Sequence, residues 1–201
     1  EFNVDEGQQV YFVNPPGIES IFSRVTGDNS SSILGTLGVG GEADFYLLNP
    51  NGILFGELAQ LDLQGSFLAS SGHSFLFADS SEFNAVQPEL PPPILAVDIT
   101  PGIQYGNQTS PITLLGDLSV APEQDITLAA AGDLQITNSR ISTSTFIPFG
   151  QAPDAGNILL ISENGNLLIT ESTLESQSVS PDGDAGRGGD ITSVANSGNI
   201  Q

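Results

Sequence analysis

Short apolar runs, separated every few residues by glycine, asparagine, aspartate or serine, make up most of this chain. Examples are LDL at 61–63 and DITLA at 125–129. Runs this short, closed by turn-forming residues, predict many short β-strands. One segment, GIESIFSRV at 17–25, instead spaces its apolar residues as on one face of a helix, which predicts a short helix or helical turn.

The C-terminal half repeats itself with a step of 33 residues, as shown by Gly132, Gly165 and Gly198. The same step relates Leu134, Leu167 and Ile200, Ile136 and Ile169, Thr137 and Thr170, and Ile158 and Ile191, while Ile126 is displaced by one residue. Each unit contains three short apolar segments within roughly 20 residues, the size of one coil of a β-solenoid. A parallel β-helix, in which equivalent residues of successive coils stack, explains this pattern.

Segments between the repeats are rich in proline, glycine and aspartate, so we expect 146–156 and 179–189 to be loops ejected from the stack. The whole chain, 1–201, is predicted to be one β-helix domain, with irregular N-terminal coils at 1–86 and regular coils at 105–201. Between them, the proline-rich stretch 87–104 cannot be a central strand and is predicted to be an extra-helical excursion. Phenylalanines of the N-terminal half are predicted to stack in the core of the early coils: Phe45, Phe55, Phe67, Phe75, Phe77 and Phe83.

The charge balance restricts the partners. Asp and Glu number 24 against three basic residues, which gives a net charge of −21. The three are Arg24, Arg140 and Arg187, so a basic face for nucleic acid cannot be assembled, and docking on an anionic membrane is disfavoured. This acidity favours a soluble monomer. Cysteine is absent, which excludes disulfides and thiol chemistry.

The first residues show neither a basic nor an apolar leader region, and no apolar run has the length of a membrane-spanning helix. The sequence is therefore expected to be a processed piece of a longer protein.

The sharpest turn signal is Asn49-Pro50-Asn51-Gly52, between two apolar runs. Proline fixes φ for the second position of a β-turn, asparagine can bond back to the backbone, and Asn-Gly tolerates left-handed conformations. The flanking residues are expected to enter the core: Leu47, Leu48, Ile53 and Phe55.

Several motifs occur in a characteristic order: EFNVDEGQQVYFVNPPG, SRVTG, ILGTLGV and ADFYLLNPNGILFG. This succession resembles the N-terminal secretion domain of the filamentous-haemagglutinin and haemolysin exoproteins of two-partner secretion, and the wording of two motifs resembles cyanobacterial members. The resemblance covers about residues 1–85. By this resemblance the Asn49–Gly52 turn matches a signature motif of the family, and Asn14 and Pro15 stand where another of its motifs is expected.

The resemblance implies a right-handed parallel β-helix with extra-helical strands. It also implies that the domain has no catalytic activity and no cofactor. The resemblance further implies that the domain is bound, largely unfolded, in the periplasm of a Gram-negative-type bacterium by a dedicated outer-membrane β-barrel transporter of the TpsB type, through its POTRA domains. By the same resemblance, we expect it to fold first at the cell surface and to template the rest of the exoprotein, which stacks at its C-terminus. Two roles remain open for the Asn49 turn: a folding element, or a direct transporter contact.

Rival chemistry has weaker support. His73, the only histidine, lies in a turn-like stretch without a nucleophile motif. Asp44 and Asp62 are the carboxylates that a polysaccharide hydrolase would need as a pair. Acidic residues of a glycine-rich stretch form the best metal candidate, a calcium loop that fails the EF-hand pattern: Asp182, Asp184 and Asp190.

The second class of function is an adhesin or glycan-binding module. It would be favoured if the tyrosines formed one coplanar exposed set, whereas buried tyrosines favour a scaffold. The chain has three: Tyr11, Tyr46 and Tyr105.

Overall fold

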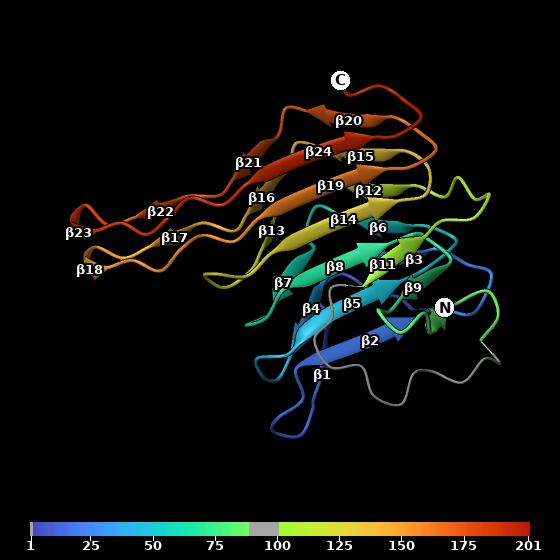
Figure 1. The fold of residues 1–201 in the computed structure, drawn as a ribbon, viewed down its shortest axis with the longest axis horizontal. Helices are drawn as coiled ribbons and strands as arrows, with labels where there is room; N and C mark the ends of the chain where they lie inside the picture. The colour runs from blue at the N-terminus through green and yellow to red at the C-terminus, as the bar shows by residue number, and fades with distance from the viewer. Residues whose placement is uncertain (1, 89–100) are drawn as a thin grey trace.

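The computed structural model describes residues 2–88 and 101–201, and within these ranges it holds strands, turns and loops but no helix. Figure 1 shows the strands stacked into sheets, with the chain climbing from the blue N-terminal coils to the red C-terminal coils. Almost all strand pairs in these sheets are parallel, which confirms the predicted all-β parallel solenoid. None of the described residues forms a helix that could cross a membrane.

The solenoid has three sides. The largest, the long sheet, has six parallel strands in the stack order β2 (Ser20–Arg24), β5 (Asp44–Leu48), β8 (Phe67–Ser70), β14 (Ile126–Ala130), β19 (Ile158–Ser162) and β24 (Ile191–Ala195). The second side consists of β3 (Ser31–Ile33), β6 (Ile53–Phe55), β12 (Ile112–Leu114), β15 (Leu134–Thr137) and β20 (Leu167–Thr170).

The third side is divided into two three-stranded parallel sheets. They are β1 (Gln9–Phe12), β4 (Thr36–Val39) and β7 (Gln60–Asp62), followed by β13 (Leu118–Ser119), β16 (Arg140–Ser142) and β21 (Thr173–Glu175). The chain visits the long sheet, the second side and the third side in this order on every turn, so three short strands make one coil.

The 33-residue repeat corresponds to the strand register between successive C-terminal coils. Leu134 pairs with Leu167, and Ile158 pairs with Ile191, each 33 residues further on. Ile126 pairs with Ile158, 32 residues on, which accounts for its displacement by one residue. Equivalent apolar residues therefore stack in columns inside the solenoid, because each coil repeats the side-chain pattern of the coil below.

One apolar core fills the interior, and its lower part is aromatic. Phe45 and Phe67 are stacked with ring centroids 6.2 Å apart, and Phe55 meets Phe67 edge-on at 6.0 Å. All three are at most 1% exposed, as the sequence predicted. Burial of side chains this large contributes more apolar area per residue than the aliphatic columns above.

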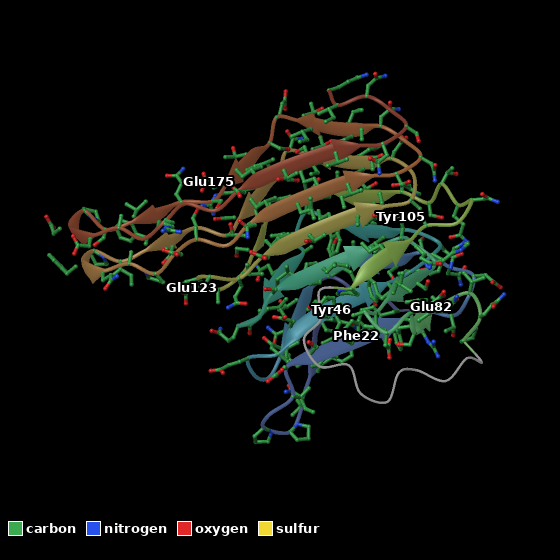
Figure 2. All side chains as sticks on the ribbon, viewed as in Figure 1. Phe22, Tyr46, Glu82, Tyr105, Glu123 and Glu175 are labelled. Atoms are coloured by element: carbon green, nitrogen blue, oxygen red, sulfur yellow. The ribbon has the colours of Figure 1, made fainter. Side chains whose placement is uncertain are left out.

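A second apolar cluster lies outside the solenoid, on the outer face of the long sheet. It is covered by an antiparallel sheet whose order is β10 (Glu82–Asn84), β9 (Ser74–Leu76) and β11 (Gly102–Gln104). Phe22 and Tyr46, labelled in Figure 2, stack on each other there with centroids 4.4 Å apart. The buried members of the cluster are Tyr46, Leu48, Leu68, Phe75, Phe77 and Ala85.

The prediction that Phe75, Phe77 and Phe83 stack inside the early coils was therefore wrong. These rings cover outward-facing side chains of the long sheet, because that sheet is apolar on both faces where the early coils lie. A run of apolar residues does not reveal which of two apolar faces it will cover. The predicted excursion, 87–104, includes β11, while its residues 89–100 lie outside the described residues.

The helical segment predicted at 17–25 was also wrong, because Ser20–Arg24 is strand β2, paired in register with β5. Ile21 packs against the main core and Phe22 against the second cluster, so consecutive side chains point to opposite faces of the sheet. Two buried faces give a strand adjacent apolar residues, which imitates helical spacing over so short a segment.

The ejected loops form an arm, defined here as residues 143–156 and 176–189, which projects from one side of the stack (Figure 1). Its two limbs pair in parallel: β17 (Thr145–Phe146) with β22 (Ser178–Val179), and β18 (Phe149–Gln151) with β23 (Asp182–Asp184). Hydroxyls of the upper limb also donate to carbonyls of the lower limb, from Ser176 to Gly156, Ser178 to Pro153 and Ser180 to Gly150. The arm is thus a hydrogen-bonded extension of two successive coils.

Candidate functional site

The Asn49 turn, residues 49–52, connects β5 of the long sheet to β6 of the second side. The Gly52 N–H donates to the Asn49 carbonyl at 3.0 Å, which closes a four-residue β-turn. Proline at the second position and glycine at the fourth match a type I turn. Left-handed backbone is used by Gly52 alone of these four residues, with φ at 102°.

The strands on either side of the turn are anchored in both apolar clusters. Leu47, Ile53 and Phe55 lie in the main core, and Leu48 lies in the second cluster, so all four are buried as predicted. Alternate residues of β5 therefore enter opposite clusters, which fixes the position of the turn that follows.

Asn49 is fully buried, with 0% of its surface exposed. Its Nδ2 donates to the Asn29 carbonyl at 3.0 Å and to Ser31 Oγ at 2.9 Å, and its Oδ1 accepts from the Asn51 N–H at 3.0 Å. The Asn51 side chain adds a second donor to this oxygen at 3.2 Å. Both amide hydrogens and both acceptor positions of Asn49 are therefore used, as a buried amide requires.

Asn51 ties the turn to the loop of the coil below. Its Nδ2 donates to the Gly27 carbonyl at 2.7 Å. The Ser31 N–H, at the end of the same loop, donates to the Gly52 carbonyl at 3.0 Å. The 27–31 loop and the Asn49 turn are consequently one hydrogen-bonded corner of two stacked coils.

The coil above closes the other side of the turn. The Ile53 N–H donates to the Pro111 carbonyl at 3.1 Å. A Cβ at Gly52 would lie 2.8 Å from the same carbonyl oxygen, closer than side chains are found to approach. Glycine is therefore required at position 52 both by its φ angle and by the contact with Pro111.

Asn14 and Pro15 lie elsewhere. They belong to the loop that precedes β2, while the Asn49 turn follows β5, and β2 and β5 are parallel neighbours in register. The two segments are therefore at opposite ends of the long sheet. Within the loop, the Ile18 N–H donates to the Pro15 carbonyl at 3.4 Å, and Asn14 Nδ2 approaches the same oxygen at 3.4 Å. The structure does not join the predicted transporter-recognition residues into one surface.

The acidic residues in and directly after the upper limb of the arm do not assemble a metal centre. Asp182 and Asp184 are exposed on β23, and the Asp190 N–H donates to Asn157 Oδ1 at 2.9 Å. Across residues 2–88 and 101–201, no group of three or more histidine, cysteine, aspartate or glutamate side chains is placed to hold a metal ion. The calcium loop considered from the sequence therefore has no assembled ligand set.

The tyrosines do not form a coplanar exposed set. Tyr11 lies on the third side and is 41% exposed, Tyr46 is buried beneath the antiparallel sheet, and Tyr105 is partly buried in the connection to β12. A hydrogen bond to Asp62 raises the pKa of the Tyr11 hydroxyl above its usual value. Burial raises the pKa of Tyr46.

The carboxylates considered for hydrolysis are also separate. Asp44 lies on the long sheet and accepts from the Ser66 N–H at 2.7 Å, while Asp62 lies on the third side and accepts from the Tyr11 hydroxyl. His73 is partly buried, and its N–H donates to the Gln104 carbonyl at 2.6 Å in the antiparallel sheet. The two carboxylates have local side-chain partners, whereas the His73 bond is made by its backbone, and the fold does not bring the three side chains to one site.

Arg24 has a structural role that the sequence did not suggest. Its Nη1 donates to the Asn84 carbonyl at 2.6 Å, its Nη2 donates to the Pro88 carbonyl at 2.9 Å, and its guanidinium lies 4.6 Å from the Phe83 ring centroid. A lone arginine at the end of a strand without any other charge was the available signal. Arg24 thereby fastens the antiparallel sheet to the solenoid.

Comparisons with known proteins agree with this geometry. The family model described as TPS secretion domain matches residues 1–201. A curated relative, the Heme/hemopexin-binding protein of Haemophilus influenzae, is 35% identical over 66 residues, which is 33% of this chain and 7% of that protein. No solved structure matches the chain. The chain belongs to the TPS secretion domain family, the secretion domains of two-partner-secretion exoproteins.

Proposed function

We propose that a dedicated outer-membrane transporter with periplasmic POTRA domains recognises this domain before it folds, and that the domain then nucleates the β-helix at the cell surface. The observation that carries the proposal is the burial of the Asn49 turn. Asn49 is 0% exposed, and both asparagine side chains of the turn bond to the 27–31 loop of the coil below. Once folded, the turn offers Asn49 to no partner, so its contribution to secretion is to drive folding.

The upper end of the stack supports the second half of this proposal. Ile191 and Ile200 are 44% and 53% exposed, whereas Ile158 and Leu167, which precede them in the same columns, are fully buried. An open column above a filled one is the surface on which further coils of the exoprotein would stack. The secreted domain would then be a monomer that carries the distal chain on β24.

A role without catalysis fits the separation of the chemical groups. Asp44 and Asp62 lie on different sides of the solenoid, and His73 is held in the antiparallel sheet. Hydrolysis of a glycoside needs two carboxyl groups facing one bond, with a fixed separation. The acidic surface, with a net charge of −21, would also repel anionic polysaccharides and nucleic acids.

The adhesin or glycan-binding alternative gains little from the tyrosines, since Tyr46 is buried and Tyr11 lies on another side of the solenoid. The name of the Haemophilus influenzae relative supplies no support for heme binding here, because the match covers 7% of that protein.

A secretion assay tests the proposal. The chain, fused behind a signal peptide, is expressed with and without its transporter. Wild type and Asn49→Ala/Asn51→Ala are compared, and the thermal unfolding of both purified proteins is measured in parallel. We expect wild type outside the cell only with the transporter, and the variant to be both unstable and retained. Retention of a variant with normal stability would make the turn a transporter contact and contradict the folding role.

A further inference from the structure

The arm overhangs the coil below it. In that lower coil the corresponding corner, between β13 and β14, is a short connection at 120–125, whereas the next two coils extend into the arm. Figure 2 shows Glu123, from this short connection, beneath the arm. Among the described residues, β18 pairs with β23 and with no other strand, so its lower edge is open.

The hydrogen bonds show which backbone groups face this open edge. The Pro148 carbonyl accepts from Asp182 N–H at 3.3 Å, and the Ala152 N–H donates to the Asp184 carbonyl at 2.8 Å, both toward β23. Successive residues of a strand direct their backbone groups to opposite edges. Phe149 and Gln151 therefore direct their N–H and C=O groups to the lower edge, where an added strand can bond.

Two aromatic side chains of the lower limb are exposed, Phe149 on β18 itself and Phe146 on the neighbouring strand β17. Phe146 is 66% exposed and Phe149 is 72% exposed, which makes them the most exposed phenylalanines of the described chain. The limbs that carry them are fixed by the parallel pairs and by the serine hydroxyls of the upper limb. A rigid element that holds phenylalanine in water is typical of an interaction surface, since burying such a side chain is favourable.

A hollow of about 400 Å³ continues the open edge toward the body, lined by Glu123, Gln151, Ala152, Pro153 and Asp154. The surrounding charges are mostly negative: Glu123, Asp154, Asp182 and Asp184 against Arg187. An occupant of this edge must therefore tolerate or prefer negative potential, which favours basic side chains.

We propose that the lower edge of the arm binds an extended segment of another protein that alternates apolar and basic residues. The segment pairs with Phe149 and Gln151 as an added strand, its apolar side chains cover Phe146 and Phe149, and its lysines or arginines face Glu123 and Asp154. Strand addition supplies affinity through the main chain and selectivity through alternate side chains. The binding concerns the folded domain and does not depend on the transporter.

The test uses a fluorescein-labelled peptide of about ten residues that alternates valine and lysine, and its counterpart with glutamate in place of lysine. Fluorescence anisotropy is measured with the folded domain at low and moderate salt. We expect the lysine peptide to bind and the glutamate peptide not to bind. Phe149→Ser is expected to weaken binding at least about tenfold. Gln151→Pro, which removes an N–H from the open edge while leaving the bonds to β23, is expected to weaken it similarly.

Leu58→Ser is the matched control, because Leu58 is an exposed apolar residue outside the arm, 62% exposed. Its affinity for the lysine peptide should equal that of wild type. The proposal is wrong if both peptides bind equally, or if neither Phe149→Ser nor Gln151→Pro changes the affinity while both retain the wild-type melting temperature. It is also wrong if neither peptide binds. Weaker binding of Phe149→Ser to neutral phosphatidylcholine vesicles would in that case make the arm a membrane contact.

Discussion

Two segments of this chain share the pattern Asn-Pro-x-Gly, and the fold treats them in opposite ways. Asn49–Gly52 is enclosed between coils, and Asn49 and Pro50 are buried. Asn14–Gly17 is a loop at the other end of the long sheet, in which Pro15 and Gly17 are exposed. Both segments end on a glycine with positive φ, 102° and 86° respectively. The local turn chemistry is thus shared, and the difference between the segments comes from their neighbours.

The two glycines differ in how closely neighbouring coils approach them. A Cβ at Gly52 would meet the Pro111 carbonyl oxygen at 2.8 Å, while one at Gly17 would meet nothing within 4 Å. The Asn49 turn has a coil on each side, since it bonds to Ser31 and to Pro111. The Asn14 loop is the corner between β1 and β2 of the first coil, and it contacts the next coil at Gly41 only through Asn14. Turn-forming residues therefore specify a turn, and the stacking of coils decides whether the turn also holds the fold together.

The largest effect should come from Asn49→Ala. It leaves the Asn29 carbonyl, Ser31 Oγ and the Asn51 N–H without their buried partner. Each such group costs about 1–3 kcal/mol when it remains unsatisfied, so we expect a loss of about 3 kcal/mol in the free energy of unfolding, after partial relaxation. Urea unfolding followed by circular dichroism measures it.

Asn49→Asp is a useful companion variant, because it keeps the acceptor for Asn51 N–H and removes the two donors. Because it also buries a carboxylate whose second oxygen faces the Asn29 carbonyl oxygen, it should be at least as destabilising as Asn49→Ala at neutral pH. A loss below about 1 kcal/mol for Asn49→Ala would contradict the role of the side chain as a link between coils.

Alanine at the two glycines gives the next effect. Gly52→Ala combines an unfavourable φ with a contact to the Pro111 carbonyl, and we expect about 2 kcal/mol of destabilisation. Gly17→Ala has the unfavourable φ alone, in open space, and should cost about 1 kcal/mol. The two melting temperatures, measured side by side, isolate the contribution of the coil above. Equal losses would show that the contact with Pro111 relaxes without cost.

Asn51→Ala should have a smaller effect, about 1 kcal/mol. Its Nδ2 bond to the Gly27 carbonyl is at the solvent-exposed side of the turn, so water can replace the donor. The loss should be local: limited proteolysis should cut within 26–30 sooner than in wild type, while the main unfolding transition changes little. Unchanged proteolysis would mean that Ser31 and Gly52 hold this loop without Asn51.

The repeat and the turn could be predicted from the sequence for a shared physical reason. In a stack each coil packs on a coil of similar structure, so paired residues such as Leu134 and Leu167 have similar side chains. Their spacing can therefore be read from the sequence. Turn chemistry is equally local, because the φ angles of proline and glycine do not depend on distant residues. The displacement of Ile126 by one residue was visible for the same reason, since it is a displacement in register.

What could not be predicted depends on contacts without a period. Phe22 and Phe75 meet on the outer face of the long sheet, and no spacing distinguishes an outward apolar side chain from an inward one. The partners of Asn49, namely Asn29 and Ser31, lie in a loop of unremarkable composition, and they are recognised only once two coils are stacked. The strand pairing within the arm likewise depends on the stacking of the two coils from which the arm projects.

The smallest effect is the most informative for secretion. Asn14 Oδ1 accepts no hydrogen bond from the described residues, and its Nδ2 makes one long contact with the Pro15 carbonyl, so Asn14→Ala should change the free energy of unfolding by less than about 0.5 kcal/mol. A variant that folds normally separates recognition from folding, which Asn49→Ala cannot do. If Asn14→Ala is secreted normally, secretion depends on folding and not on a contact at Asn14. If it is retained in the cell with an unchanged melting temperature, this exposed loop contacts the transporter. A clear loss of stability would instead show that the loop is held by the stack, and the contrast between the two turns would fail.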